Sequence, residues 1–418
     1  MERALNALQV AALLVSASYG IGFLFGSGEL AVSHGMAGSI YGLSTAFGML
    51  LLAVFAARLW HGGLPIWDLF GRAYGGGMKN SVALLSLVWM AGVLAAQIHG
   101  GVAIMRLLGL TDWVSYGVVL AGIFIASRLN LRLASTIFSL FLLASGLVLV
   151  YAVVSGHAGQ IYMESPSRLV TDLGTFQPWT AMSIFIAVVA LVCTGADYHQ
   201  FLLAARKSSA AVWGCLLAGI CLCAVSFLPA SVVIGLQSEG GLAGLQDSKQ
   251  VIPFALSRVA SQAGSIAAGN ILLLGLSAAA LGSGAAIVRA MTSALAAATK
   301  VERTDETPWM TLISLGIGAA LASRGQGIVA TMVSVNVIYI ASIAWPFICL
   351  LAGRTLTPSQ ALAVVATGFV SASVVYAASW LGKPFNDSDF VSLVVGLMAS
   401  GFLIAGFWLR GTVRRIPT

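Results

Sequence analysis

The chain has 418 residues, of which 59% are hydrophobic and only 8% are charged. Soluble domains carry about a quarter charged residues, so this composition excludes a soluble globular protein and indicates a polytopic membrane protein. The net charge of +7 needs no nucleic-acid partner, because anionic lipid headgroups account for it.

Apolar stretches that reach the roughly 20 residues needed to cross a bilayer recur along the whole chain. They predict about twelve transmembrane helices, near residues 7–33, 37–57, 81–107, 113–127, 134–155, 179–204, 209–236, 265–298, 308–323, 327–352, 359–380 and 390–410. The first stretch is too long for a cleaved signal peptide. The longest loops are 156–176 and 237–264, and the second holds a predicted short helix at 250–260.

The distribution of Lys and Arg predicts the orientation. Fourteen of them fall on the side of the N-terminus: Arg3, Arg58, Arg72, Lys79, Arg128, Arg132, Arg206, Lys207, Lys300, Arg303, Arg354, Arg410, Arg414 and Arg415. Six fall on the other side, namely Arg106, Arg168, Lys249, Arg258, Arg324 and Lys383, and Arg289 lies within a span. The positive-inside rule therefore predicts cytoplasmic N- and C-termini, and we expect the protein in a bacterial inner membrane.

Two predicted spans are interrupted by residues that weaken a helix. Span one reads SYGIGFLFGSGE at 18–29, with four glycines and Glu29, and span six has Gly195 and Asp197 in LVCTGADYHQFLLAAR. Close helix packing is the alternative reading of span one, because Gly22 and Gly26 form a GxxxG pattern. Interrupted helices at matching positions of two halves, 7–155 and 179–352, are typical of a transporter binding site at the bilayer midplane. Five spans per half is an odd number, so the halves run in opposite orientations.

Five stretches together resemble the sodium:solute symporter family. They are SASYGIGFLFGSGELAVSHG, LPIWDLFGRAYGG, YHQFLLAARKSSAA, AAALGSGAAIVRAMTSALAAATK and AWPFICLLAGRTLTPSQALA, in the order and spacing of that family's core segments. The resemblance implies a LeuT-type fold: an all-α membrane protein with a five-plus-five inverted-repeat core at 1–352. Residues 353–418 then form two additional C-terminal helices and a short basic tail.

The resemblance also implies a sodium site between core helices one and eight. The ligands it assigns are the carbonyls of Ser16, Tyr19 and Ala279 and the hydroxyl of Ser283. Many members have a second hydroxyl where this chain has Gly282. Ser135, Thr136 or Ser139 of span five could supply another oxygen. The sequence therefore leaves sodium and protons open as coupling ions, with sodium favoured and Asp197 or Glu29 as the proton carrier.

Several polar and aromatic residues in the spans are candidate solute contacts. They are Gly22, Phe23, Thr194, Asp197, His99, Asn336 and Tyr339. Asp197 is alternatively a cap of the second half-helix, and His99 and the aromatic residues are alternatively packing residues. Candidate gating or pathway residues are Glu29, Gln200 and Arg289. Glu29 is alternatively the partner of an outer cation, Gln200 an interhelical hydrogen bond, and Arg289 a side chain that reaches cytoplasmic water.

The sequence predicts a secondary active transporter that moves a small polar solute with a cation by alternating access. A free half-helix N-terminus favours a carboxylate and Asp197 favours an amine, so an amino-acid-like solute is one reading. A solute sensor built on a symporter fold is the alternative. The chain lacks HExxH, P-loop and CxxC motifs, so we expect no enzyme, no cofactor other than sodium, and free thiols at all five cysteines. The sequence does not indicate the oligomeric state.

Overall fold

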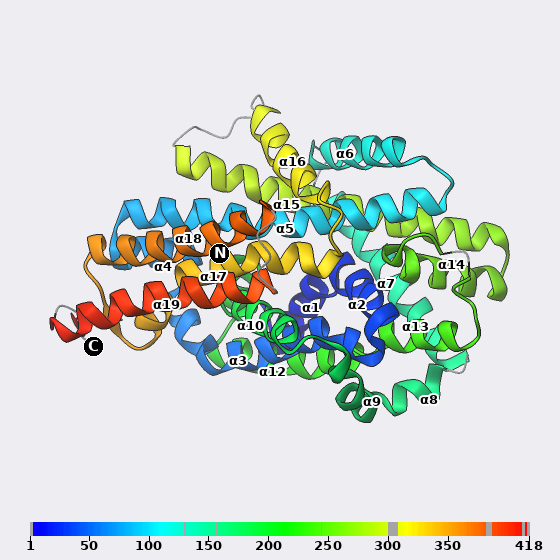
Figure 1. Cartoon of the computed structure of the whole chain (residues 1–418), viewed down its shortest axis with the longest axis horizontal. Helices are drawn as coiled ribbons and strands as arrows, with labels where there is room; N and C mark the ends of the chain where they lie inside the picture. The colour runs from blue at the N-terminus through cyan, green and yellow to red at the C-terminus, as the bar shows by residue number, and fades with distance from the viewer. Residues whose placement is uncertain are drawn as a thin grey trace.

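The computed structural model describes residues 3–128, 131–155, 158–243, 245–299, 308–381, 387–411 and 414–415 (Figure 1). Apart from turns and loops, the described residues form helices, one bridge between Leu5 and Ala205, and the paired strands β1 (Arg354–Thr355) and β2 (Arg414–Arg415). Helices dominate because a lipid-embedded backbone must satisfy its N–H and C=O groups within each segment.

The first half of the chain contains α1 (Ala7–Ser18), α2 (Ile21–His34), η1 (Gly35–Ser39), α3 (Ile40–Gly62), α4 (Ile66–Tyr74), α5 (Gly76–Leu107), α6 (Asp112–Arg128) and α7 (Leu131–Ser155). The linking segment contains α8 (Ala158–Met163), α9 (Ser165–Asp172) and η2 (Leu173–Thr175). The second half contains α10 (Pro178–Thr194), α11 (Ala196–Leu203), α12 (Ser208–Val225), α13 (Leu228–Ser238), η3 (Ser248–Gln250), α14 (Val251–Ala263), α15 (Ile266–Thr299), α16 (Pro308–Ala322) and α17 (Ile328–Leu351). The helices α18 (Pro358–Trp380) and α19 (Ser388–Leu409) follow.

The packing of the two halves is symmetric. Helix α3 packs on α10 as α1 packs on α12, and α17 packs on α5 as α7 packs on α15. Likewise α16 packs on α5 as α6 packs on α15, and α4 packs on α5 as α14 packs on α15. Each contact between two helices therefore has a matching contact between the helices at the corresponding positions of the other half. The core is therefore the predicted inverted repeat of two five-span halves.

The observed helices lie where the sequence predicts about twelve spans. In the described residues, seven stretches are long and apolar enough to cross a membrane alone: Ile21–Gly62, Gly76–Leu107, Ser208–Ser238, Ile266–Ala296, Ile328–Leu351, Pro358–Ser379 and Ser388–Leu409. Helices α10 and α11, bent by 40° at their break, make an eighth. The stretches Ala7–Ser18, Leu143–Val154 and Pro308–Ala322 are apolar but shorter. A criterion based on helix length alone therefore finds fewer than twelve spans, because the other predicted spans are broken or consist of shorter helices.

The bundle has two opposite ends, the α4 face and the α14 face, each with a short amphipathic helix. Figure 1 shows α4 and the C-terminus toward one end, and α13 and α14 toward the other. At the α4 face, Arg3 donates to the Trp60 carbonyl at 3.0 Å, and Arg354 pairs with Arg415 in the short sheet. Helix α4 buries Ile66, Phe70 and Tyr74 on one side, which fits its amphipathic pattern.

Glycines bring the central helices into close contact. A Cβ on Gly92 of α5 would lie 2.3 Å from Val335 of α17, and one on Gly48 of α3 would lie 2.7 Å from Val192 of α10. Lipid tails are as apolar as the side chains, so helices in a bilayer associate by such close packing rather than by a hydrophobic driving force. This use explains many of the 47 glycines.

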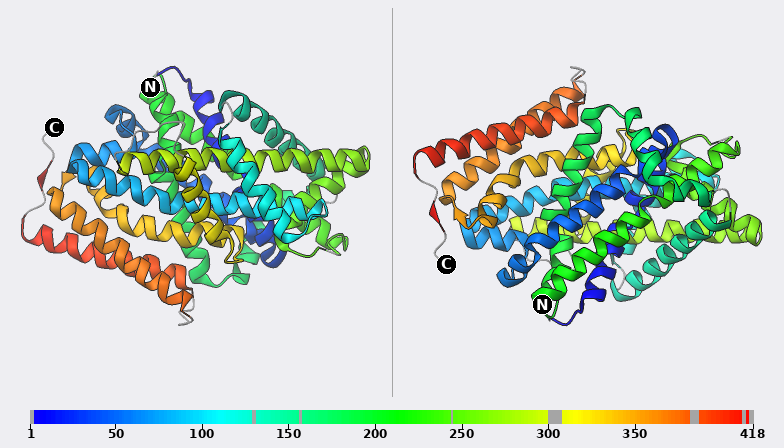
Figure 2. Two further views of the ribbon diagram at one scale, coloured as in Figure 1. Left: turned by 90° about the horizontal axis from the view of Figure 1, so that it is seen from above. Right: turned by 90° about the horizontal axis from the view of Figure 1, so that it is seen from below.

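The C-terminal helices α18 and α19 pack on each other and on α17, and Figure 2 shows them along one outer edge of the molecule. Trp345 of α17 donates to the Leu397 carbonyl at 2.9 Å. A Cβ on Gly368 of α18 would lie 2.2 Å from the Ala341 carbonyl oxygen. The pair is thus an addition that covers one side of the second repeat.

Candidate functional site

Both interrupted spans contain a real break. Helix α1 ends at Ser18 and α2 begins at Ile21, and the Gly20 N–H donates to the Ser18 carbonyl at 2.9 Å. Helix α10 ends at Thr194 and α11 begins at Ala196, with extended backbone at Gly195 (φ −68°, ψ 126°). The two breaks lie close together, because α11 packs against α1.

The break in span one is narrower than predicted. The sequence marks the stretch 18–29 as interrupted, whereas Gly22, Gly26 and Gly28 all lie within α2. A Cβ on Gly22 would lie 2.9 Å from Met332, and one on Gly26 would lie 2.7 Å from Val329. The packing role considered for these glycines is thus the one the structure supports, and the break itself is confined to Tyr19 and Gly20.

Aromatic side chains surround the two breaks. Phe23, in the first turn of α2, lies with its ring 5.4 Å from the Tyr19 ring and 6.5 Å from the Tyr41 ring. The rings of Trp89 on α5 and Tyr339 on α17 are 6.4 Å apart. The Tyr339 hydroxyl donates to the Thr194 carbonyl at 3.3 Å. Tyr339 thus bonds to a carbonyl at the end of α10, next to the break.

Several buried polar atoms beside these rings have no hydrogen-bond partner in the described structure. They are both side-chain amide atoms of Asn336, Nε1 of Trp89 and Oδ1 of Asp197. Asn336 is fully buried and lies between Met332 and Tyr339 on one face of α17, at i, i+4 and i+7. A buried polar group without a partner costs about 1–3 kcal/mol. Such a cost is expected where a polar ligand completes the bonding.

Asp197 is the second residue of α11, so its carboxylate lies in the first turn of the helix, beside the backbone N–H groups at its N-terminus. A Cβ on Gly195 would lie 2.6 Å from Oδ1 of Asp197, so glycine leaves the space for this oxygen. The carboxylate therefore lies at the N-terminus of α11, which the sequence-based reading assigned to a solute carboxylate, and it presents one buried oxygen without a partner.

His99 lies apart from the aromatic residues at the breaks. It follows Trp89 by ten residues on α5, a rise of roughly 15 Å along the helix. Its side chain lines a cavity of about 180 Å³ near the α14 face, together with Arg106, Tyr116 and Lys249. The structure thus does not bring His99 together with Asn336 and Tyr339, because the helix carries it toward the α14 face.

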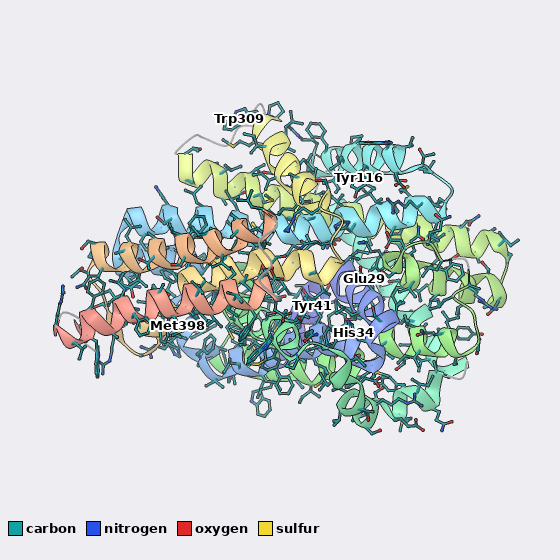
Figure 3. All side chains as sticks on the ribbon, in the orientation of Figure 1. Glu29, His34, Tyr41, Tyr116, Trp309 and Met398 are labelled. Carbon is teal, nitrogen blue, oxygen red and sulfur yellow. The ribbon has the colours of Figure 1, made fainter. Side chains whose placement is uncertain are left out.

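Glu29 belongs to a hydrogen-bonded contact between the two repeats at the α14 face. One carboxylate oxygen accepts from the Ile328 N–H at the start of α17 at 2.7 Å. The other lies 3.9 Å from Lys249 Nζ, and the Ser248 hydroxyl is 3.5 Å away. In Figure 3 Glu29 lies where α2 approaches the end of α17. This is the geometry of the alternative in which Glu29 is the partner of an outer cation.

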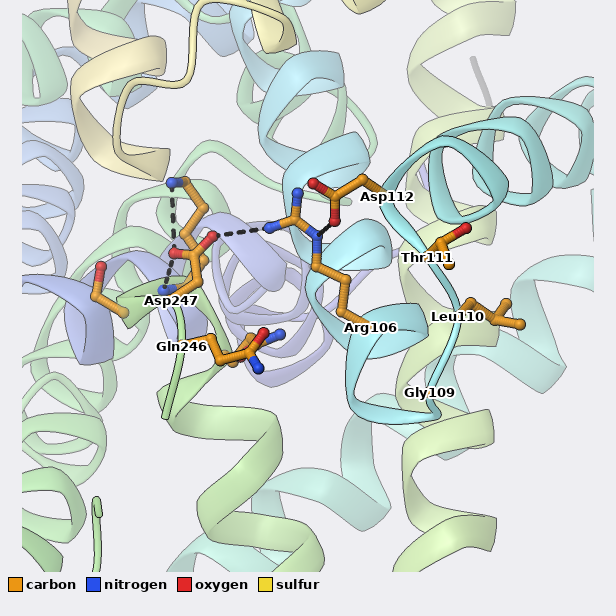
Figure 4. Close-up of a pocket in the computed structure, with 10 residues that line it drawn as sticks. Arg106, Gly109, Leu110, Thr111, Asp112, Gln246 and Asp247 are labelled. Carbon is orange, nitrogen blue, oxygen red and sulfur yellow. Dashed lines mark hydrogen bonds and ion pairs between the residues drawn. The ribbon is translucent and has the colours of Figure 1, made fainter. Parts of the chain in front are cut away.

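The ionic contacts continue across a cavity of about 830 Å³ at the same face (Figure 4). Arg106 lies between two carboxylates, 2.7 Å from Asp112 and 3.2 Å from Asp247, and Asp247 is 3.5 Å from Lys249. These residues come from the end of α5, the start of α6 and the segment before α14. The charges therefore join elements of both repeats across the α14 face.

The other two predicted pathway residues lie elsewhere. Arg289 donates to the carbonyls of Ser127, at 2.9 Å, and Ala126, so it caps the C-terminal end of α6. Gln200 is exposed on α11 and its carbonyl accepts from the Ala204 N–H. Neither is brought beside Asn336 or Tyr339. Arg289 has a reason to be in a span, since a cation stabilises free carbonyls at a helix end.

The residues predicted to bind sodium lie on α1 and α15. Ser16 and Tyr19 border an apolar cavity of about 640 Å³ together with residues of α7, α12 and α13. On α15, Ala279 is buried and Ser283, one turn later, is half-buried. The side chains of Ser135, Thr136 and Ser139 lie outside the described residues. The assignment of a sodium site to these oxygens stays a prediction.

The cysteines that the structure describes are all free, as predicted: Cys193, Cys215, Cys221, Cys223 and Cys349.

No protein-family model and no curated protein sequence matches this chain. Solved structures do. A Na⁺-coupled sialic acid symporter in its substrate-bound outward-open state aligns with a TM-score of 0.60 at 11% identity, over 98% of this chain and 97% of that one. Mhp1, a nucleobase-cation-symport-1 family transporter in a closed conformation, aligns with 0.59 at 16% identity, over 98% and 94%. A point mutant of the Eremococcus coleocola manganese transporter aligns with 0.53 at 14% identity, over 95% and 93%.

The chain has the fold of these transporters. The predicted LeuT-type inverted-repeat fold is confirmed. The likeness extends to three kinds of transporter at low identity, so it does not single out the sodium:solute symporter family.

Sequence reasoning missed several residues at the breaks, namely Ser18, Tyr41, Trp89 and Tyr198. Trp89 stands in an apolar run of α5 and looks like a packing residue, because its unpaired N–H is visible only in three dimensions. Of these residues, Tyr198 could most easily have been predicted, since it directly follows Asp197 in the sequence.

Proposed function

We propose that this chain is a secondary active transporter that moves a small polar solute together with a cation by alternating access. The observation that carries the proposal is the pair of adjacent helix breaks with unpartnered buried polar atoms beside them. In inverted-repeat transporters, substrate and ion sites lie at such breaks near the bilayer midplane. The likeness in fold to two symporters and a manganese transporter supports the same reading.

The contacts at the two faces support alternating access. At the α14 face, Glu29 of α2 accepts a hydrogen bond from α17 and pairs with Lys249 of η3. These contacts cross the route from this face to the breaks. Breaking these bonds would let one repeat rock relative to the other. We infer that the α14 face is the outer one and the α4 face the cytoplasmic one, because predicted inner cations such as Arg3, Arg58 and Arg354 gather at the α4 face.

We propose sodium as the coupling ion, held by the carbonyls of Ser16, Tyr19 and Ala279 and the hydroxyl of Ser283. Hard cations take several oxygen ligands, and the break after α1 supplies carbonyls near Ser16 and Tyr19 that no helical N–H occupies, whereas the Ala279 carbonyl comes from within α15. Gly282 gives no oxygen, so water is left to complete the shell. In the competing proton-driven version Asp197 is the carrier, because Glu29 is engaged with Ile328 and Lys249 while Asp197 keeps an unpaired oxygen.

The test is solute uptake by the purified protein in liposomes with an imposed sodium or pH gradient. We expect uptake to follow the sodium gradient and to fall in Ser283→Ala. The matched control is Ser81→Ala, which removes an exposed hydroxyl bonded only to its own helix at the Gly77 carbonyl. Uptake that follows the pH gradient alone and tolerates Ser283→Ala would overturn the sodium assignment. Solute binding without any uptake would favour the sensor alternative.

A further inference from the structure

The unpaired side-chain amide of Asn336 defines what kind of solute fits beside the breaks. Its carbonyl oxygen and its NH₂ group are both buried without a partner, and they lie side by side in one plane. The complementary group is an N–H next to a C=O in one plane, which accepts and donates at once. Asparagine recognises the edge of a nucleobase through the same kind of bidentate pairing.

The indole of Trp89 adds a third requirement. Trp89 is 2% exposed, and its N–H is buried without a partner. An indole N–H only donates, so it requires an acceptor on the solute. Its ring lies 6.4 Å from the Tyr339 ring, three residues along α17 from Asn336. The solute therefore needs an acceptor in addition to its paired donor and acceptor.

The surrounding aromatic rings favour a flat solute. Trp89 and Tyr339 face each other from α5 and α17, one helix of each repeat, and Tyr19, Phe23 and Tyr41 lie around the break in span one. Aromatic side chains bind planar rings by stacking on their faces, largely without regard to the ring's substituents. A saturated amino acid or sugar has no π-face of its own for such stacking.

The charges argue against a solute carboxylate at this place. Arg289 bonds to carbonyls at the end of α6, whereas Arg106 and Lys249 bond to carboxylates at the α14 face. The Asp197 carboxylate lies in the first turn of α11, where its negative charge would repel a second carboxylate. These three cations are therefore engaged with groups away from the breaks.

We propose that the solute is a planar, uncharged heterocycle with a lactam edge, an N–H beside a C=O, as in pyrimidine and purine bases. The lactam edge pairs with Asn336, a further ring acceptor takes the Trp89 N–H, and the ring lies against Trp89 and Tyr339. This assignment rests on the proposed function, because it names the substrate of the same site.

The test is ligand binding to the purified full-length protein, which needs no ion gradient. The probes are uracil, hypoxanthine and pterin, measured by quenching of tryptophan fluorescence and by thermal shift. We expect at least one probe to bind, and N-methylation of its lactam to weaken binding about tenfold or more, the loss expected for one bidentate pair. L-alanine and glucose serve as the non-planar comparison.

Variants locate the site. Asn336→Leu is expected to weaken binding of the lactam probe about tenfold or more, while Asn336→Gln keeps part of it. Trp89→Phe keeps an aromatic ring but loses the N–H, so we expect a smaller loss. The control Asn270→Leu changes an exposed residue of α15 and is expected to leave binding unchanged. Methylated probes on the unaltered protein keep the proposal testable if Asn336→Leu fails to fold.

Two outcomes separate this proposal from the proposed function. If none of the three probes binds while L-alanine or glucose is taken up along a cation gradient, the solute class is overturned and the transporter proposal stands. If no probe binds and no solute of the panel is taken up, both are overturned.

Discussion

The Glu29 carboxylate accepts a 2.7 Å hydrogen bond from the Ile328 N–H, although the two residues are 299 positions apart. The bond places a negative charge at the N-terminus of α17, where the helix dipole favours it. Since Glu29 lies on α2 and Ile328 on α17, the bond joins the first span of one repeat to the last span of the other. Movement between the repeats at the α14 face must break it.

The first prediction concerns Glu29→Ala. The variant removes a charge-assisted bond worth about 1.5–3 kcal/mol, so opening of the α14 face should increase about tenfold or more. Hydrogen–deuterium exchange measures this directly, because the Ile328 N–H is itself the donor. The control is Glu164→Ala, which breaks an exposed 2.8 Å pair with Arg168 that contributes little to stability. Unchanged exchange at Ile328 in Glu29→Ala would contradict a gating contact.

The second prediction concerns Arg289→Met. Loss of the guanidinium leaves the carbonyls of Ser127 and Ala126 without these donors, which costs about 1–3 kcal/mol. We expect a lower midpoint of thermal unfolding and an unchanged KM for solute uptake. Arg168→Met, on an exposed helix, is the control and should leave both quantities unchanged. A large rise in KM without a change in thermal stability would return Arg289 to the solute pathway.

The third prediction tests the docking of the C-terminal helices. In Gly368→Ala the new Cβ would lie 2.2 Å from the Ala341 carbonyl oxygen, so α18 must shift away from α17. Overpacking of this kind costs about 1–3 kcal/mol, and the midpoint of thermal unfolding should fall. In Gly316→Ala of α16 the Cβ meets no atom within 4 Å, and alanine favours a helix over glycine. That variant should be neutral or slightly stabilising, and equal effects of the two variants would argue against the observed packing.

The helices of this protein could be predicted from sequence because the bilayer imposes long apolar segments. The predicted span 308–323 and the observed α16 (Pro308–Ala322) differ by one residue. Gly195 and Asp197 also marked the second break correctly, since both are unusual within an apolar helix. The break in span one was harder to predict, because glycine as a residue type serves two purposes there: a helix break at Gly20 and close packing at Gly22 and Gly26.

Contacts between distant segments could not be predicted in this way. Nothing near Ile328 in the sequence identifies Glu29 as its partner, and nothing near Arg289 indicates that it meets the end of α6. These pairings depend on how the two repeats pack, which a single sequence does not specify. The unpaired atoms of Asn336 and Trp89 are likewise defined only by what the fold leaves around them.

The last prediction concerns Asp197, which lies in the first turn of α11 and keeps Oδ1 buried without a partner. Asp197→Asn keeps the shape of the side chain and an acceptor oxygen in the first turn of α11, so the fold should persist while the charge is lost. If the charge binds the solute or the coupling proton, truncating a buried charged contact costs about 2–5 kcal/mol, and uptake should fall about 30-fold or more. The matched control is Asp68→Asn, because Asp68 also lies in the first turn of a short helix but pairs with Lys79 in a solvent-accessible position at 2.7 Å. Uptake into liposomes and thermal unfolding are measured on the same preparations. Unchanged uptake and affinity in Asp197→Asn would mean that Asp197 is only a helix cap, and the site would then have to be reassigned to the Asn336 side of the breaks.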